Sequence, residues 1–399
     1  MPEPPAKKRI LIVITTLGFG GAETQVVTLA GELARRGWTV GVACLLKPAA
    51  WSEHLEKQGV AVYSLEMKRG VPDLRAILRL RQLVKSFRPS IVHSHMVHAN
   101  LLARITRLIC PMPALVCTAH NLKETSEKGG PTWYKEVLYR LTDFLADRTT
   151  IICRAAFDRY VKVGAVPVAK LEVIPNGIDV QRFSPSPEAR TAARGTLGIA
   201  ASTFVWLSVG RLVEQKDYPT LLAAVRLMPD KDFVVMIAGK GALLESLQAE
   251  CLRLGLDGKV KFLGASENVG QLYVASDAFV MSSVFEGLSA ALLEASAMAL
   301  PSVVTDVGGN TEIVTPGKTG YVVPAGNPVR LCEALKNMMA LDDEQRQSLG
   351  EAARRHCLAT YRLELVTDRW LELYARCLAR TSLSARKTSA VVASSAAPQ

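Results

Sequence analysis

Short apolar runs alternate along the chain with longer stretches in which apolar residues recur every three to four positions. The first run, from Arg9 to Thr15, is apolar at nearly every position, which is typical of a strand buried on both faces of a parallel sheet. Alternation of such strands with amphipathic helices predicts an α/β fold of doubly wound parallel sheets. The predicted strands are 9–15, 39–45, 60–64, 90–93, 114–118, 149–153, 171–174, 203–209, 233–238, 260–264, 278–281 and 302–305. The predicted helices are 22–36, 51–58, 72–87, 97–109, 132–147, 154–163, 327–340, 343–357 and 363–379.

A turn-rich segment divides this alternation into two halves. Asn176-Gly177 marks a tight turn, and Pro, Ser and Glu residues follow it to about Ala189. The length of 399 residues also suggests two domains. We therefore expect an N-terminal domain at 9–180, a C-terminal domain at 190–360 and a last helix at 361–380. Residues 1–8 and 381–399 are expected to be disordered tails, because their Pro, Lys, Ser and Ala content offers little to bury.

Composition narrows the class of protein. Hydrophobic residues make up 49% of the chain, which is ample for sizeable cores, and no apolar run reaches the roughly 18 residues of a membrane span. No secretory signal is recognisable either, so we expect a cytoplasmic protein. The eight cysteines are scattered without a C-x-x-C pair, and most lie in apolar patterns, so buried free thiols are expected.

Positive charge is concentrated in the N-terminal half. Residues 1–180 hold 25 Lys and Arg against 15 Asp and Glu, a net charge of +10, whereas the remainder holds 23 against 22, a net charge of +1. A basic half suggests an anionic partner, such as lipid head groups, a lipid-linked pyrophosphate or nucleic acid, although a merely solvated basic face would look the same. Helix 72–87 carries Arg75, Arg79, Arg81 and Lys85 beside an apolar stripe, so it could lie on an anionic surface.

The strongest candidate site lies between residues 286 and 312. Small residues here open a helix whose first turn carries no charge, and the free amides of such a helix N-terminus bind phosphate. Glu286 precedes this helix, and Glu294 lies far enough along it to reach ribose hydroxyls. The pattern predicts a diphosphate with a polar group on each side, which describes a nucleotide-sugar. The residues expected to hold it are Glu286, Gly287, Leu288, Ser289, Ala290, Ala291 and Glu294.

Two cations follow an earlier strand of the same half. Arg211 comes directly after strand 203–209, and Lys216 opens the next helical region. Two cations separated by a short loop at a strand end suit a diphosphate, because they neutralise the charge of the leaving group as the glycosidic bond breaks. Two unrelated surface charges are the alternative.

The spacing of Glu286 and Glu294, E-x7-E, resembles the signature of the retaining GT-B glycosyltransferases of family 4, also called group 1. Further segments between Ile10 and about Arg380 are similar to motifs of that family, in the family's order. They are Gly20-Gly21-Ala22-Glu23, His120, Ile174-Pro175-Asn176-Gly177-Ile178-Asp179, Gly210-Arg211 with Lys216, and Gly308-Gly309 to Glu312. The resemblance implies the GT-B fold, in which two Rossmann-like domains face each other across a cleft and the C-terminal one binds most of the donor.

The resemblance also implies roles for single residues. Gly20 and Gly21 would let their loop approach the donor phosphate and the acceptor. His120 would lie beside the transferred sugar and the reaction centre, with His95 in the acceptor region. Phe262 and Leu263 leave a strand that resembles the family's base-binding loop. Lys240 and Ala242 stand where the family usually has an acid and a proline, which puts contacts from their loop in doubt.

Two patterns invite a metal interpretation. His93, His95 and His98 form H-x-H-x-x-H, which suits zinc, but no further ligand lies nearby in sequence, and loop residues near the acceptor are the simpler interpretation. Asp230-Lys231-Asp232 precedes its strand at the wrong end of the sheet, so a turn is favoured there. We therefore expect no metal ion and no cofactor, with the nucleotide-sugar as a co-substrate.

Together these features predict a retaining, metal-independent hexosyltransferase. The expected donor is a UDP-linked sugar, and the expected acceptor is a hydroxyl of a lipid-linked or polysaccharide molecule in cell-surface glycan synthesis. A peripheral position on the inner face of the membrane follows from the basic N-terminal half, and nucleic acid is not expected as a partner. The alternatives are a soluble acceptor, a GT-B-type sugar-nucleotide epimerase, a nicotinamide oxidoreductase, which the missing G-x-G-x-x-G disfavours, and a non-catalytic sugar-binding protein.

Overall fold

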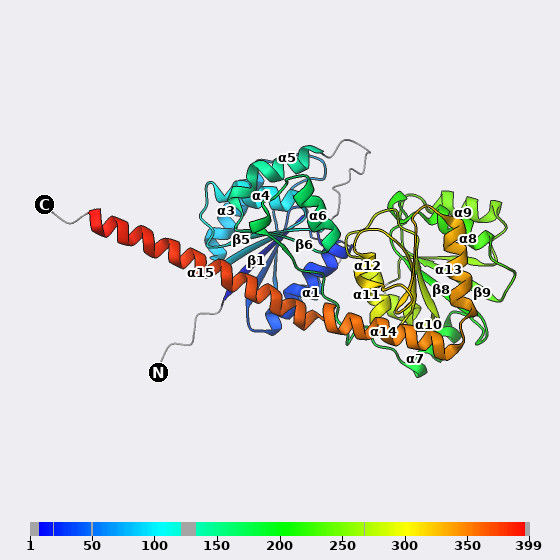
Figure 1. Cartoon of the computed structure of the whole chain (residues 1–399). Helices are drawn as coiled ribbons and strands as arrows, with labels where there is room; N and C mark the ends of the chain where they lie inside the picture. The colour runs from blue at the N-terminus through cyan, green and yellow to red at the C-terminus, as the bar shows by residue number, and fades with distance from the viewer. Residues whose placement is uncertain (1–7, 19, 49–50, 121–132, 267, 396–399) are drawn as a thin grey trace. The chain divides into compact units, whose positions relative to one another are not determined.

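The computed structural model describes residues 8–18, 20–48, 51–120, 133–266 and 268–395, with side chains to residue 380. The chain forms two compact units (Figure 1). Unit 1 comprises Met1–Gly177 together with Leu363–Gln399, and unit 2 comprises Ile178–Arg362. The sequence analysis placed the corresponding boundaries at 180, 190 and 361.

Unit 1 is built on a seven-stranded sheet in which every pair of neighbours is parallel, in the order β3-β2-β1-β4-β5-β6-β7. Its strands are β1 (Arg9–Ile14), β2 (Thr39–Cys44), β3 (Ala61–Ser64), β4 (Ile91–His95), β5 (Leu115–Ala119), β6 (Arg148–Ile151) and β7 (Leu171–Val173). Its helices are α1 (Gly21–Arg35), α2 (Ser52–Lys57), α3 (Arg75–Phe87), α4 (Val97–Arg107), α5 (Trp133–Thr142), α6 (Arg154–Lys162) and α15 (Leu363–Ser395), with short 3₁₀ helices η1 (Asp143–Leu145) and η2 (Val168–Lys170).

Strand β1 explains why the first apolar run is uninterrupted. Side chains alternate between the two faces of a strand, so Ile10, Ile12 and Ile14 enter one core and Leu11 and Val13 enter the other. Helices α1 and α15 cover the first face, and α3 and α4 cover the second. All five side chains are fully buried, as a doubly wound parallel sheet requires.

Unit 2 repeats this design with six parallel strands in the order β10-β9-β8-β11-β12-β13. Its strands are β8 (Phe204–Val209), β9 (Phe233–Ala238), β10 (Val260–Gly264), β11 (Ala278–Met281), β12 (Ser302–Thr305) and β13 (Gly320–Val323). Its helices are α7 (Pro187–Thr196), α8 (Tyr218–Arg226), α9 (Leu244–Arg253), α10 (Val269–Ala275), α11 (Ala290–Ala297), α12 (Asn310–Ile313), α13 (Pro328–Ala340) and α14 (Asp343–Tyr361), with the 3₁₀ helix η3 (Glu214–Lys216). Trp206, Leu221 and Val303 lie in its core.

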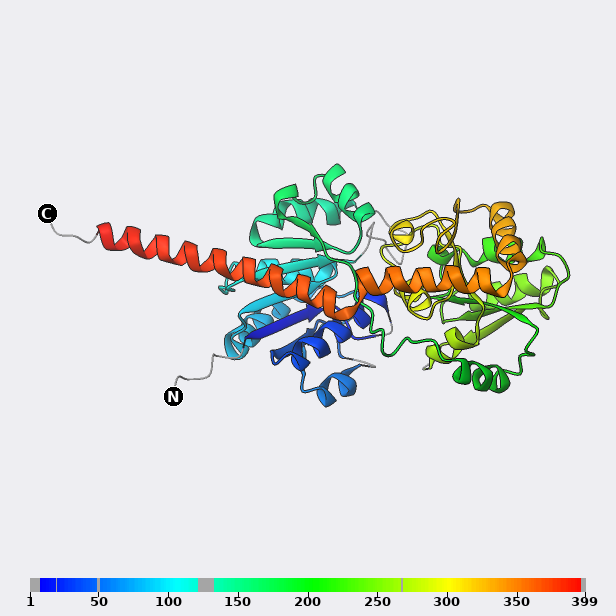
Figure 2. The ribbon, with the colours of Figure 1, turned by 60° about the horizontal axis from the view of Figure 1, so that its bottom comes forward.

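The last helix differs from its prediction. Helix α15 runs without interruption to Ser395 (Figure 2), so the expectation of a disordered tail from residue 381 is wrong for residues 381–395. The segment holds Ala, Arg, Lys and Leu as well as Ser, and these residues favour a helix once α15 has formed. Residues 396–399 and 1–7 lie outside the described part of the chain. Within the described residues, no helix is both long enough and apolar enough to cross a bilayer.

Several elements of unit 2 were not predicted from the sequence, among them α7, α9, α10, α12 and β13. Helix α7 begins at Pro187, inside the segment interpreted as a linker, and Ser186 caps it by accepting a hydrogen bond from the Ala189 amide at 3.2 Å. Strand β13 has only four residues and begins at Gly320. A Cβ there would lie 2.0 Å from the Ser302 carbonyl oxygen, so the close pairing with β12 requires glycine.

Candidate functional site

Three loops of unit 2 converge because their strands are neighbours. Strands β8, β11 and β12 lie side by side and parallel, so the loops that follow them leave from the same edge of the sheet. The loop after β8 carries Gly210 and Lys216, the loop after β11 carries Glu286, and the loop after β12 carries Gly308. Residues that lie far apart in sequence therefore form one site.

An ion pair joins two of these loops. The Lys216 ammonium lies 2.6 Å from Glu286 Oε1, and the Ser283 hydroxyl donates to the same oxygen at 2.7 Å. The two charged side chains are only 15% and 7% exposed. Ser282 Oγ donates to the Lys216 carbonyl at 2.9 Å, so backbone and side chain of Lys216 are both held by the loop after β11. This geometry fixes a cation in a largely desolvated place, where its field is strong.

Glycines let these loops pack against one another. Gly308 has a φ of +54°, and a Cβ at this position would lie 1.9 Å from the Glu286 carbonyl oxygen. The amide of Gly309 donates to the Gly287 carbonyl at 2.7 Å, and Thr305 Oγ1 donates to the Ser283 carbonyl at 2.6 Å. The Gly-Gly pair therefore sets the position of the segment that carries Glu286.

Helix α11 begins where the sequence predicts a phosphate-binding helix N-terminus. Ser289 is its N-cap and accepts a hydrogen bond from the Leu292 amide at 3.4 Å, while the first turn holds no acidic residue. The amides of Ala290 and Ala291 occupy the first two helical positions and so have no acceptor within the helix. A helix of this kind offers two backbone donors and the positive end of its dipole to an anion.

Glu294 lies in a different environment from Glu286. It accepts a hydrogen bond from the Tyr273 hydroxyl at 2.9 Å, and this hydroxyl also lies 3.0 Å from the Ala291 carbonyl. Burial raises the pKa of Glu294 to about 7, an effect that the Tyr273 hydrogen bond and the charge of Arg182 only partly offset. The residue as a whole is half-buried.

In unit 1, three histidines form a buried cluster at the ends of β4 and β5. His93 hydrogen-bonds the Tyr374 hydroxyl of α15 through Nδ1 and Thr118 Oγ1 through Nε2, both at 2.7 Å. His95 Nδ1 lies 2.9 Å from His120 Nε2. Among the described residues, the buried atoms His95 Nε2 and His120 Nδ1 have no hydrogen-bond partner.

Burial keeps this cluster neutral. It lowers the pKa of His120 to about 4 and that of His93 to about 3, and it lowers the pKa of His95 well below its ordinary value. One ring of the His95–His120 pair therefore donates and the other accepts. His95 is fully buried, whereas His120 is 7% exposed, so His120 is the more accessible ring of the pair.

Comparison with known proteins identifies the family. The family described as Glycosyltransferase Family 4 matches residues 19–182, and the family described as Glycosyl transferases group 1 matches residues 189–356. The chain is a group 1, family 4 glycosyltransferase. Its two Rossmann-like parallel-sheet units have the GT-B fold, as the sequence predicts.

Individual relatives agree with this assignment. The glycosyltransferase is 26% identical to UDP-Gal:alpha-D-GlcNAc-diphosphoundecaprenol alpha-1,3-galactosyltransferase of Escherichia coli, over 76% of this chain and 80% of that protein. It is 29% identical to D-inositol 3-phosphate glycosyltransferase of Corynebacterium diphtheriae, over 84% and 85%. Anabaena Alr3699/HepE in complex with UDP-glucose has the same fold, with a TM-score of 0.79 at 21% identity over 92% of this chain and 99% of that one.

Other predicted residues of the glycosyltransferase lie in an exposed loop, on a strand and at the start of a helix. Arg211 is exposed, and its side chain makes no hydrogen bond or ion pair with the described residues, while its carbonyl accepts a hydrogen bond from the Val213 amide at 3.0 Å. Phe262 and Leu263 are half-buried on β10, at the edge of the sheet, where the pairing with β9 shifts register between Phe262 and Gly264. Gly20 is the N-cap of α1, and Gly21 is its first residue. The roles of these residues stay predictions.

Some contacts could not be found from the sequence. Tyr273, the partner of Glu294, belongs to α10, which carries no motif. His93 was grouped with His95 and His98 as a possible metal pattern, but His98 is exposed on α4. Among the described residues, no group of three or more His, Cys, Asp or Glu side chains is placed to hold a metal ion. The expectation of a metal-independent enzyme stays a prediction.

Proposed function

We propose that this glycosyltransferase moves a hexosyl group from a UDP-sugar to a hydroxyl of a lipid-linked or polysaccharide acceptor in cell-surface glycan synthesis, with retention of the anomeric configuration. The observation that carries the proposal is the buried Lys216–Glu286–Ser283 constellation beside the N-terminus of α11. The Escherichia coli galactosyltransferase acts on a lipid diphosphate, and Alr3699/HepE binds UDP-glucose, which favours a nucleotide-sugar donor here.

Different residues of unit 2 bind different parts of the donor. The amides of Ala290 and Ala291 and the ammonium of Lys216 bind the diphosphate, and exposed Arg211 adds a second cation. Glu286 orients the sugar through its hydroxyls, and Glu294 binds the ribose. Gly287, Leu288 and Ser289 position this segment, and Phe262 and Leu263 contact the base. These groups are fixed before the reaction, so they stabilise developing charge without reorganising.

The transfer exchanges one bond at the anomeric carbon for another. The bond from this carbon to the β-phosphate oxygen breaks, and the electron pair leaves with UDP. The acceptor oxygen attacks from the same face, and its proton passes to the departing phosphate oxygen. Lys216 and the α11 amides stabilise the charge that grows on this phosphate, so neither a metal ion nor a covalent nucleophile has a role in this scheme.

Unit 1 supplies the acceptor side in this proposal. His120 is neutral because burial lowers the pKa of its ring to about 4, and in this proposal its Nδ1, which has no partner among the described residues, hydrogen-bonds a sugar hydroxyl. His95 holds His120 from behind through the 2.9 Å contact. Gly20 and Gly21, at the start of α1, keep the neighbouring backbone accessible.

A soluble acceptor is the second candidate. The Corynebacterium diphtheriae relative is named for an inositol phosphate acceptor and is slightly more identical to this chain than the Escherichia coli enzyme. The lipid-linked acceptor is favoured here by the net charge of +10 in residues 1–180, which suits a peripheral position on an anionic inner leaflet.

The deciding experiment measures UDP release from a panel of UDP-sugars, each with an undecaprenyl diphosphate-linked sugar, with soluble sugar phosphates or with no acceptor, in the presence and absence of EDTA. We expect release that depends on the lipid-linked acceptor and persists in EDTA, with an anomeric product signal that matches the donor by NMR. Acceptor-independent interconversion of the UDP-sugar would instead identify an epimerase. An inverted product would refute retention, and loss of activity in EDTA would refute metal independence.

A further inference from the structure

Helix α5 shows its apolar residues to solvent and buries polar ones. Trp133, Val137 and Leu141 recur at four-residue spacing and are 65%, 41% and 64% exposed. The buried positions of the helix are Lys135 and Tyr139, whose hydroxyl accepts a hydrogen bond from Asn100 Nδ2 at 2.5 Å. A helix that packs only against its own protein has the opposite arrangement. The described part of the chain therefore leaves the apolar stripe of α5 uncovered.

The stripe continues into the next elements of unit 1. Phe144 of η1 lies three residues beyond Leu141 and is 71% exposed. It lines a pocket of ≈ 550 Å³ together with Val161 of α6 and Val168 of η2. We call the exposed apolar residues of this surface the α5 face; they are Trp133, Val137, Leu141, Phe144, Val161 and Val168. Contiguous apolar patches of this kind mark interaction sites.

Cations rim the α5 face, while nearby acids are already paired. Arg140 and Lys170 line the pocket beside Phe144, and Arg140 makes no ion pair with any described residue. Asp143 is buried and bound to Lys170 at 3.2 Å, and Glu136 is paired with Arg159. Residues 133–170 hold seven Lys and Arg against four Asp and Glu, a net charge of +3. Apolar side chains with Trp at one end, and the Arg140 guanidinium without an acidic partner among the described residues at the rim, match an anionic lipid surface.

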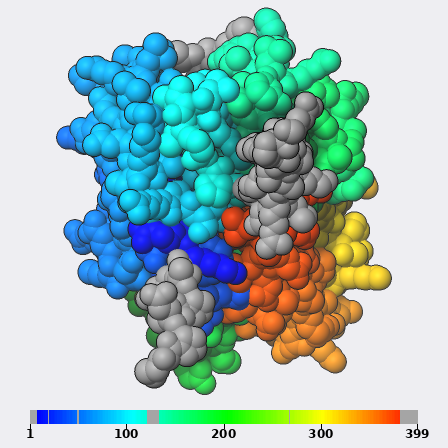
Figure 3. All heavy atoms as spheres, turned by 90° about the vertical axis from the view of Figure 1, so that its left-hand side faces the viewer, coloured from blue at the N-terminus to red at the C-terminus, as the bar shows by residue number. Residues whose placement is uncertain are grey.

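Exposed apolar side chains are strongly biased toward unit 1. Among the described residues, unit 1 holds fourteen of the eighteen exposed large apolar side chains. In Figure 3 the surface of α3 and α4, in blue and cyan, adjoins that of α5 and α6 in green. The bias therefore belongs to one unit and is not a general property of the chain's surface.

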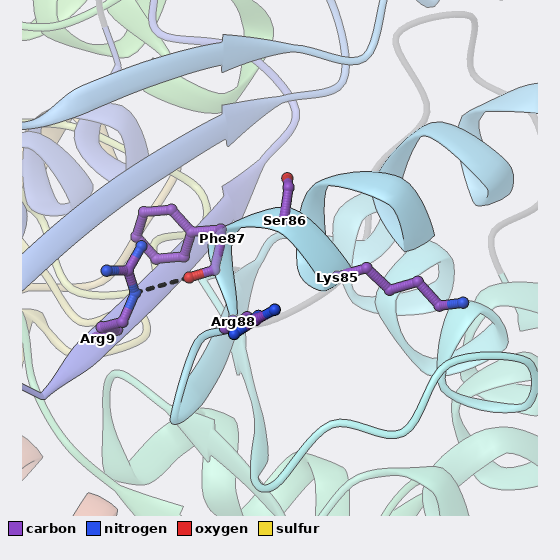
Figure 4. A pocket seen from close by; sticks show the side chains of 5 residues that line it. All are labelled: Arg9, Lys85, Ser86, Phe87 and Arg88. Carbon is purple, nitrogen blue, oxygen red and sulfur yellow. Dashed lines mark hydrogen bonds between the residues drawn. The ribbon is translucent and has the colours of Figure 1, made fainter.

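The basic helix singled out from the sequence is a weaker candidate. In α3, Arg79 donates to the Leu65 carbonyl at 2.7 Å and to Asp73 at 2.9 Å, and Arg75 also pairs with Asp73. A small pocket at its C-terminal end is lined by Arg9, Lys85 and Arg88, but Figure 4 shows the Lys85 side chain directed away from Arg9. The cations of α3 are thus partly neutralised or divergent, unlike Arg140.

We propose that the α5 face docks on an anionic bilayer, with its apolar side chains in the head-group region and Arg140 against lipid phosphates. The inference deepens the proposed function, because a lipid-linked acceptor requires the enzyme at a membrane. It does not depend on which sugar is transferred. Docking through α5 holds unit 1, which carries the acceptor-side histidines, at the surface where such an acceptor lies.

The test uses the full chain and vesicles of phosphatidylcholine alone or of an equal mixture with phosphatidylglycerol. Co-sedimentation is measured for wild type, for Trp133→Ser/Leu141→Ser/Phe144→Ser and for Arg140→Gln. We expect binding to the anionic vesicles, at least a tenfold loss of affinity in the triple variant, and a smaller loss in Arg140→Gln that disappears at high salt. Brominated lipids should quench wild-type fluorescence more than that of Trp133→Phe.

Two control variants test whether the loss of vesicle binding is specific to the α5 face. Leu74→Ser/Leu78→Ser removes exposed leucines from α3, and Leu227→Ser/Leu252→Ser removes them from unit 2, so both should bind vesicles like wild type. If the α3 variant loses binding and the α5 variant does not, the assignment of the surface is wrong. If wild type ignores anionic vesicles and forms a dimer that the triple variant abolishes, the occupant is a second copy, and the proposal is equally wrong.

The proposed function can fail separately from this inference. UDP-sugar binding, followed by thermal shift, should be equal in wild type and in the triple variant, because no α5 residue has a role at the donor site. Vesicle binding without any response to UDP-sugars would leave the docking surface intact and refute the proposed function. Normal UDP-sugar turnover with the undecaprenyl diphosphate-linked acceptor and no vesicle binding would do the reverse.

Discussion

Replacing Lys216 separates the catalytic role of the Lys216–Glu286 pair from its structural role. The Lys216→Met change leaves Glu286 with the Ser283 hydroxyl alone, in a place where the carboxylate is 7% exposed. An under-satisfied buried acceptor costs about 1–3 kcal/mol. We therefore expect unit 2 to lose stability of that size in Lys216→Met. The double variant Lys216→Met/Glu286→Gln removes both charges at similar volume, so we expect it to recover most of the loss.

Activity should follow a different pattern. If the ammonium stabilises the departing diphosphate, its loss costs roughly 10²–10³-fold in kcat, or about 3–4 kcal/mol of transition-state stabilisation. The charge is absent in both the single and the double variant, so the double variant should regain stability without regaining activity. Lys318→Met, at an exposed lysine of the same unit, is the matched control and should change neither property.

The assay pairs single-turnover and steady-state UDP release with hydrogen exchange of peptides from β11 and β12. Peptide-level exchange reports unit 2 separately, which is necessary because a chain of two units need not unfold in one step. Recovery of kcat together with stability in the double variant would refute the leaving-group role. It would make Lys216–Glu286 a structural ion pair only.

Three further predictions concern the backbone and the titrating groups. Gly308→Ala should destabilise unit 2 by more than about 2 kcal/mol in chemical unfolding, because φ is +54° and the Cβ would lie 1.9 Å from a carbonyl oxygen. Gly317→Ala is the control, because Gly317 has a φ of +72° but open space where a Cβ would lie, and it should cost about 1 kcal/mol. Burial raises the pKa of Glu294 to about 7, so the folded state holds this proton more tightly than the unfolded state. The free energy of unfolding should therefore fall as pH rises from about 4.5 to about 7, by at most about 3 kcal/mol. Glu294→Gln should flatten that fall in urea titrations. Burial lowers the pKa of His120 to about 4, so unit 1 should lose stability as pH falls from about 6.5 to about 4. His95→Gln keeps a group that can hydrogen-bond to His120, so this variant should retain the wild-type pH–rate profile. His95→Phe lacks such a group and should alter the profile.

The sequence was sufficient for the parts of the fold and site that depend on strand ends. Continuous apolar runs such as 10–14 are typical of strands buried on two faces, and the carboxyl ends of neighbouring parallel strands lie at one edge of the sheet. The sequence therefore predicts that the loops carrying Lys216, Glu286 and Gly308 meet at one site, and the contacts among these loops agree with it. The family resemblance added the order of the two units and the GT-B name, which periodicity does not supply.

The contacts that remained hidden join segments for which the sequence gives no pairing rule. Tyr374 reaches His93 from 281 positions away, because α15 packs on the face of the sheet opposite to α3 and α4. The stripe of α5 was equally hidden. Its apolar spacing is that of a core helix, and only the burial of Tyr139 and Lys135 reveals that the stripe faces outward. Periodicity identifies an apolar face but not the partner that covers it.

The two glutamates of the E-x7-E pattern illustrate how one residue type acquires two chemistries. Glu286 Oε1 accepts hydrogen bonds from an ammonium and a hydroxyl, whereas Glu294 accepts a hydrogen bond from a phenol, and burial raises the pKa of Glu294 to about 7. Environments that differ in this way assign different roles to neighbouring carboxyl groups. Glu294 can accept or donate a hydrogen bond near neutral pH, which suits a ribose hydroxyl, while Glu286 Oε1 is already in contact with Lys216 and Ser283. Donor affinity should therefore respond to pH near 7 through Glu294, and a Glu294→Gln variant whose UDP affinity kept the wild-type pH dependence would contradict this division.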